Sequence, residues 1–168
     1  AERLSAARPD LSITLSSQVC PEIREYERQS TACANAYVQP LMSRYLTKLD
    51  EALQSMGFMC PFLLMTSGGG LTTLDTSIKF PVRLVESGPA GGAILATEIA
   101  KECGIDNVLS FDMGGTTAKI CLIDDYTPQM TRTFEVARVY RNLKGSGLPL
   151  RIPAIEMVEI GAGGGSIA

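Results

Sequence analysis

The residues best suited to chemistry lie between two apolar runs, in the stretch 108–124, VLSFDMGGTTAKICLID. Asp112 ends the first run, and the turn after it supplies two glycines and two threonines, Gly114, Gly115, Thr116 and Thr117. Glycines let the backbone approach a ligand closely, and threonines add hydroxyl groups beside exposed amides. The stretch therefore predicts a β-hairpin whose turn suits a phosphate group with its metal ion.

An ordinary hairpin would use the same residues, since a tight turn between two apolar strands needs positive φ angles. Two further glycine clusters favour ligand binding, because each follows an apolar run, at 67–70 and at 161–166. The first cluster ends the run PFLLMT (61–66), which predicts a buried strand with a loop at its carboxyl end, where α/β sheets bind ligands. A simple flexible turn is the alternative for that loop.

The longest element that could position these loops is a helix. Pro21, with acidic residues just after it, predicts the start of this helix, and Gly57 predicts its end. We expect Pro40 to kink or split it. Apolar side chains recur at steps of three to four residues and predict one stripe that faces the core, formed by Ile23, Tyr26, Cys33, Tyr37, Leu41, Tyr45, Leu49 and Leu53. A short strand is expected before the helix, over 12–19.

A second helix is predicted to begin at Ser87 and to end at Gly104, and small residues line its first turns. Two interpretations explain the small residues. Either the helix packs very tightly on a sheet, or its amino end lies against a ligand whose negative charge meets free amides. Both can hold at once.

The composition argues against several classes of protein. At 168 residues and 45% hydrophobic, the chain is long enough for one domain with a real core. The net charge of −3 and a pI near 5.0 argue against a nucleic-acid surface, which needs a basic face. No apolar run approaches the ~18 residues of a membrane span. The absence of histidine excludes a Ser-His-Asp or Cys-His mechanism within the chain.

The cysteines are odd in number and widely spaced, and none forms a C-x-x-C pair. This spacing argues against a zinc site or a disulfide framework, and a reducing cytoplasm is the expected compartment. Cys33 lies in a helical pattern and Cys121 in a strand pattern, so we expect both thiols to be small buried hydrophobes.

Five sequence words occur in one order: CPEIREYERQSTACANAYVQP, MTSGGG, ESGPAGGAILA, SFDMGGTTAKICLID and IEMVEIGAGGGSIA. In these words the chain resembles the hydantoinase A / 5-oxoprolinase family over nearly its whole length. The resemblance implies an α/β fold of the ribonuclease H-like, actin-like ATPase type, shared with sugar kinases and heat-shock ATPases. It also implies a single partial domain over 1–168, with a helical segment at about 21–56 and a mixed α/β segment at about 58–168.

Members of this family use ATP to open cyclic amides such as hydantoins or 5-oxoproline. By resemblance, ATP and Mg²⁺ are the cofactors, Asp112 holds Mg²⁺ through water, and the four turn residues 114–117 cradle phosphate oxygens. The other two glycine loops would border the same cleft, through Ser67, Gly68 and Gly69 and through Gly163, Gly164 and Gly165. A histidine-free mechanism is plausible because phosphorylating the amide oxygen makes a good leaving group, and the enzyme then mainly positions and neutralises phosphate.

The sequence departs from many relatives at two places. Ala118-Lys119 stands where many relatives continue as Thr-Asp, and Ser17 stands where many carry a histidine. Lys119 could offset phosphate charge or point to solvent from its strand, and solvent is the favoured interpretation. The family also has an earlier glycine-threonine hairpin in the other half of the cleft, so we expect the chain to be an internal fragment that is inactive alone.

The leading hypothesis is therefore a fragment of an ATP-dependent cyclic amide hydrolase that acts with a companion subunit or as a homo-oligomer. One alternative is a subunit of an ATP-dependent ketone carboxylase. The other is a non-catalytic assembly domain, in which the glycine loops are structural and the long helix docks a partner subunit.

Overall fold

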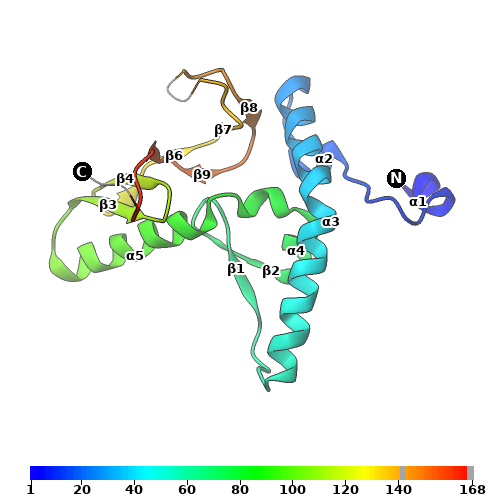
Figure 1. The fold of residues 1–168 in the computed structure, drawn as a ribbon, viewed down its shortest axis with the longest axis horizontal. Coiled ribbons are helices and arrows are strands. Elements are labelled where there is room, and N and C mark those ends of the chain that lie inside the picture. Colours follow the sequence, from blue (N-terminus) through cyan, green and yellow to red (C-terminus); the bar gives the residue numbers. More distant parts are fainter. Residues whose placement is uncertain (141–142, 166–168) are drawn as a thin grey trace. The chain divides into compact units, whose positions relative to one another are not determined.

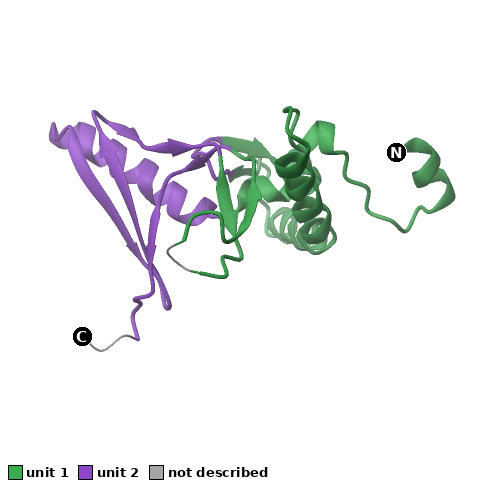
Figure 2. Cartoon of the chain, turned by 90° about the horizontal axis from the view of Figure 1, so that it is seen from above, with its two compact units in different colours: residues 1–64, 71–85, 133–152 green, residues 65–70, 86–132, 153–168 purple. Residues whose placement is uncertain are grey.

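The computed structural model describes residues 1–140 and 143–165, and the chain divides into two compact units (Figures 1 and 2). Unit 1 comprises residues 1–64, 71–85 and 133–152. Unit 2 comprises residues 65–70, 86–132 and 153–168, of which 153–165 are described. Each unit is assembled from segments that are distant in the sequence. No helix among the described residues is long and apolar enough to cross a membrane.

Unit 1 is built around the 31-residue helix α3 (Glu25–Ser55). Its other helical elements are α1 (Glu2–Ala7), α2 (Ser16–Val19), α4 (Leu74–Lys79) and the 3-10 helix η1 (Pro81–Leu84). Its strands are the paired β1 (Leu63–Met65) and β2 (Leu71–Thr73), and the paired β7 (Phe134–Val136) and β8 (Leu148–Leu150); Met65 alone belongs to unit 2.

The long helix differs in detail from the one predicted. It begins at Glu25 rather than at Pro21, and it continues through Pro40 as one helix. Of the kink or split expected at Pro40, the split was therefore wrong, and the kink stays a prediction. Its end was predicted correctly, because Gly57 adopts a φ of 89° just after the last turn. The short strand expected over 12–19 was also wrong, since residues 16–19 form α2.

The face of α3 that is buried is polar rather than aromatic. Asn35 is 0% exposed; its side-chain amide donates to the Lys79 carbonyl at 3.1 Å, and its carbonyl accepts from the Val82 N–H at 3.3 Å. Most of the predicted apolar stripe faces outward instead, and Tyr37 is 87% exposed. Cys33 is exposed as well. Leu49 and Leu53 of the stripe are half-buried, and the buried apolar residue of the helix is Leu46, which the stripe did not include. The prediction failed because side-chain hydrogen bonds to the α4–η1 segment decide which face packs.

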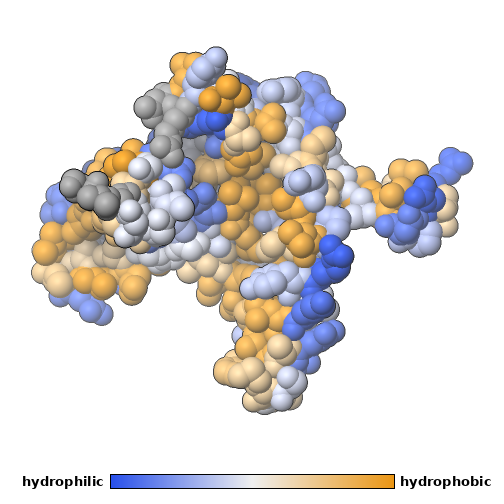
Figure 3. All heavy atoms as spheres, in the orientation of Figure 1, coloured by the Kyte–Doolittle hydropathy of each residue, from blue (hydrophilic) through white to orange (hydrophobic). Residues whose placement is uncertain are grey.

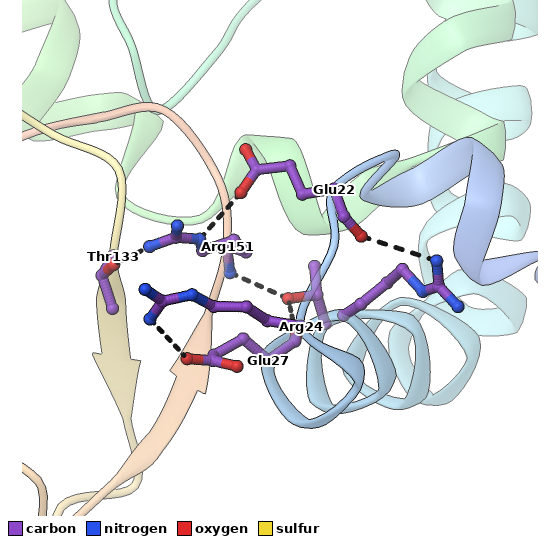
Figure 4. A network of polar contacts seen from close by, with 7 residues as sticks. Glu22, Arg24, Glu27, Thr133 and Arg151 are labelled. Atoms are coloured by element: carbon purple, nitrogen blue, oxygen red, sulfur yellow. Dashed lines mark hydrogen bonds and ion pairs between the residues drawn. The ribbon is translucent and has the colours of Figure 1, made fainter.

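Apolar packing in unit 1 surrounds a small core formed by Val19, Val82, Leu150 and Ile152. Arg151, which lies between Leu150 and Ile152 in the sequence, is part of the polar network shown in Figure 4. The Arg151 guanidinium donates to Glu22 at 2.9 Å and to Thr133 at 2.8 Å, while its backbone N–H donates to the Thr31 hydroxyl at 2.8 Å. The network ties the segment after β8 to the start of α3.

Unit 2 is a helix packed on an antiparallel sheet. Helix α5 (Ser87–Cys103) begins as predicted and ends at Gly104, which has the left-handed conformation of a helix C-cap. The sheet has the order β10-β4-β3, with β5 also paired to β4. Its strands are β3 (Asn107–Met113), β4 (Ala118–Asp124), β5 (Thr127–Pro128) and β10 (Val158–Ile160), and a separate pair is formed by β6 (Met130–Thr131) and β9 (Ala154–Ile155).

Small side chains let α5 approach the sheet closely. The core of unit 2 contains Ala90, Ala93, Cys121, Ile123 and Ile155. The tight-packing interpretation is therefore confirmed for Ala90 and Ala93 but not for Gly88 and Gly92, where a Cβ atom would meet nothing within 4 Å. The predicted burial of Cys121 is confirmed. Burial raises the pKa of the Cys121 thiol, because desolvation disfavours the thiolate.

Candidate functional site: the β3–β4 hairpin and the 161–165 loop

The predicted hairpin is present, and its turn contains the predicted glycines. Strands β3 and β4 pair antiparallel from Asn107 opposite Asp124 to Met113 opposite Ala118. The Gly114 N–H donates to the Thr117 carbonyl at 2.9 Å and closes the turn. Residues 114–116 are exposed, so their backbone is open to an incoming group.

Strand alternation places Asp112 on the α5 side of the sheet. Val108 packs against the core of unit 2, so the residues at even positions of β3 face the helix. Asp112 follows this alternation at the end of β3 nearest the turn. Its carboxylate is exposed and has no hydrogen-bond or ion-pair partner among the described residues.

The loop after β10 packs directly on the hairpin turn. The Gly164 N–H donates to the Gly114 carbonyl at 3.0 Å. Gly163 is buried, and a Cβ atom on it would overlap the backbone of Gly115 and Thr116. Glycine is thus required at position 163 by close approach of two backbones. Two of the three predicted loops are brought together in this way, although Ser166 lies outside the described residues.

The remaining loop, 67–70, is fixed on α5 and β9. The Ile155 N–H donates to the Ser67 carbonyl at 2.9 Å. Gly69 has a φ of 79°, and a Cβ atom there would lie 2.8 Å from the Ile94 side chain. A Cβ atom on Gly68 would be in ordinary van der Waals contact with Pro153, 3.4 Å from its carbonyl oxygen. These contacts give the 67–70 loop a defined conformation. The loop takes no part in the backbone contact between residues 163–164 and the hairpin turn.

Lys119 does not point freely to solvent, so the favoured interpretation of this side chain was wrong. Its ammonium forms an ion pair with Glu86, and the two side chains are 17% and 32% exposed. Glu86 is the N-cap residue of α5 and has a left-handed backbone with φ 60°. Glu86 could not be predicted as part of the site, because neither its backbone conformation nor its partner follows from a sequence motif.

The donor set suits a phosphate group with Mg²⁺. Magnesium prefers oxygen ligands and is usually held by one or two carboxylates together with waters and substrate phosphates. Asp112 supplies one exposed carboxylate, and Thr116 supplies an exposed hydroxyl beside it in the turn. No group of three or more acidic, cysteine or histidine side chains among the described residues forms a metal cage. The residues present therefore fit a metal that arrives with a phosphate.

A second candidate site lies in unit 1, where an apolar groove of about 780 Å³ runs beside α3. Tyr26, Cys33 and Tyr37 of α3 line one wall of the groove. The other walls include Val82, Val136 and Leu148. Figure 3 shows hydrophobic residues along one side of the α3 region and hydrophilic residues along the other. Sequence reasoning missed this surface because it placed the same tyrosines in the core.

Comparison with known proteins gives a family match over most of the chain. The model of the hydantoinase/oxoprolinase family matches residues 28–168. A caprolactamase subunit alpha from Pseudomonas jessenii is 36% identical over 97% of this chain and 22% of its own length. A 5-oxoprolinase from Dictyostelium discoideum is 30% identical over 92% of this chain and 12% of its own length.

Solved structures have the same fold. The crystal structure of the ATP-dependent caprolactamase from Pseudomonas jessenii matches 99% of this chain and 23% of its own, with a TM-score of 0.77 and 32% identity. A nucleotide-free acetone carboxylase matches 96% of this chain and 21% of its own, with a TM-score of 0.78 and 24% identity. The chain is thus a partial α/β fold of the actin-like ATPase type, and it spans about a quarter or less of the curated relatives it matches.

Proposed function

The chain belongs to the hydantoinase/oxoprolinase family, and on that premise we propose that it supplies the Mg-ATP phosphate loop of an ATP-dependent cyclic amide hydrolase. The observation that carries the proposal is the backbone contact between two glycine loops, in which Gly163 and Gly164 pack on Gly114 and Gly115. Asp112 lies next to this contact in the hairpin, and its carboxylate has no partner within residues 1–140 and 143–165. An ordinary hairpin turn needs no second glycine loop against it.

In this proposal each group has a limited task. The exposed turn amides and the Thr116 hydroxyl bind phosphate oxygens, and Asp112 holds the metal through water. Mg²⁺ would supply charge neutralisation for the transferred phosphoryl group. Amide resonance makes the ring carbonyl a poor electrophile, and phosphorylation of its oxygen by ATP would remove that resonance. One water would then add to the carbon, the C–N bond would break with a proton going to the nitrogen, and a second water would release phosphate from the resulting acyl phosphate. Positioning and charge neutralisation account for most of the catalysis in such phosphoryl transfers.

The test is ATP consumption by the full-length protein that contains this chain. We expect hydrolysis that depends on a cyclic amide, with 5-oxoproline, a hydantoin and caprolactam as the substrates tried first. Two curated relatives are named for opening such rings. ATP consumption that requires a ketone and bicarbonate instead would show that the protein is a carboxylase subunit. A hydrolase activity that survives Asp112→Ala would refute the role of the hairpin.

The outward stripe of α3 supports a second role, which is contact with a companion subunit or a second copy. Tyr26, Tyr37 and Leu41 are exposed large apolar side chains on one helix. Related proteins are named as subunits, such as caprolactamase alpha and acetone carboxylase beta. A Tyr37→Asp, Leu41→Asp double variant of the full-length protein should lower the mass of its complex in light scattering, whereas an unchanged mass would rule this surface out.

A further inference from the structure

Lys119 lies at the centre of a row of charged residues that crosses the sheet of unit 2. On one side its Cα partner is Asp112 of β3, and on the other side its Cα partner is Glu159 of β10. Residues directly opposite in antiparallel strands project from the same face, with Cβ atoms about 4.5–5.5 Å apart. Both carboxylates therefore flank the Lys119 side chain at close range.

A third carboxylate fixes the position of the Lys119 ammonium. Glu86 forms its ion pair with Lys119 from the start of α5, on the face of the sheet that Asp112 shares. Because both partners are mostly shielded from water, their interaction is screened less than a surface pair. By contrast, Asp112 and Glu159 are exposed, and neither has an ion-pair partner among the described residues.

The four charges sum to −2, and the cation among them is paired with Glu86 rather than with Asp112. A divalent cation at Asp112 is repelled by Lys119 and attracted by the carboxylates. The strength of metal binding thus depends on how completely Glu86 neutralises the ammonium. A change in either partner alters the field at Asp112 in a predictable direction.

We propose that Lys119 is a positioning residue of the phosphate loop, and that the Lys119–Glu86 pair sets the affinity of Asp112 for its divalent cation. The inference rests on the proposed function, since it assumes that Asp112 takes part in metal binding. In this inference Lys119, one of the two residues that stand where many relatives have Thr-Asp, adjusts the metal affinity of the site.

The test is the affinity for Mn²⁺ alone, measured from the electron paramagnetic resonance signal of free Mn²⁺ with the full-length protein. Lys119→Met removes the repelling cation and should tighten Mn²⁺ binding by at least about fivefold. Glu86→Gln leaves the ammonium without its counter-charge and should weaken binding by a similar factor. The double variant removes one charge of each sign, so its affinity should return to within about twofold of the wild type.

The two single variants should shift the Mn²⁺ affinity in opposite directions, and this distinguishes the proposed role from a purely structural one. If the pair served only the fold, both single variants would weaken binding and the double variant would be no better, which would overturn the inference. Lys119→Arg should retain wild-type affinity, and Lys101→Met, which removes the exposed Lys101–Glu98 pair on α5, should leave it unchanged.

Asp112→Ala distinguishes failure of the inference from failure of the proposed function. If the wild type has no Mn²⁺ site that Asp112→Ala removes, the proposed metal role fails and the inference fails with it. If that site exists but the Lys119 and Glu86 variants do not shift it in opposite directions, only the inference fails.

Discussion

Helices α3 and α5 bury different kinds of side chains. Helix α5 buries three alanines and Thr97, and its alanines pack against β4. Helix α3 buries Thr31 and Asn35 together with Leu46, and it displays most of its aromatic side chains. Packing of α5 in unit 2 therefore depends on small side chains, whereas packing of α3 in unit 1 depends on particular hydrogen bonds as well as on apolar contacts. The candidate phosphate loop lies in unit 2.

The largest effect on unit 2 is expected where two backbones meet. Gly163→Ala places a Cβ atom in the Gly115 backbone, which no rotamer change can relieve, so we expect a loss of about 3 kcal/mol in the free energy of unfolding. Gly165→Ala in the same loop is the control, since a Cβ atom there meets nothing within 4 Å. Urea unfolding measures both, and equal stability of the two variants would contradict the close packing of the loops.

A smaller effect is expected at the polar face of α3. Asn35→Ala leaves the Val82 N–H without its side-chain partner and removes one of the two side-chain donors to the Lys79 carbonyl, which should cost about 2 kcal/mol. Asn35→Leu should not rescue the loss, because a leucine cannot satisfy these groups. A stability for Asn35→Leu equal to that of the wild type would show that α3 is held by apolar packing after all.

The smallest effect is expected on the outer face of the same helix. Tyr37→Ala should change the free energy of unfolding of the 168-residue chain by no more than about 0.5 kcal/mol, because the side chain is 87% exposed. Leu46→Ala is the matched comparison on α3, since Leu46 is buried, and it should cost about 2–5 kcal/mol. A large loss of stability in Tyr37→Ala would show that the aromatic stripe packs in the core after all.

The same contrast explains what the sequence could and could not predict. Local signals predicted the hairpin and α5, since Gly114 and Gly115 define a turn and Gly104 ends a helix. Hydrophobic spacing assigned the wrong face of α3 to the core, because a buried Asn35 does not enter an apolar pattern. The polarity of a side chain alone does not reveal its partners.

The sequence pointed to the residues of the candidate site but to only some of the contacts between them. Asp112 and the turn glycines stood out as a motif, and the 161–166 loop was expected nearby. The Lys119–Glu86 pair was not foreseen, because it requires the left-handed conformation of Glu86 at the start of α5. Contacts of this kind depend on tertiary structure and have no spacing that a sequence pattern could reveal.

The central claim is that Asp112 and its turn bind Mg-ATP, and calorimetric titration of the full-length protein with ATP tests it most directly. Mg²⁺-dependent binding should weaken by more than about tenfold in Asp112→Ala, because one metal-holding carboxylate is lost. Asp124→Ala, at the far end of the same hairpin and also exposed, should bind like the wild type. Equal affinity of Asp112→Ala and the wild type, or no ATP binding at all, would contradict the account.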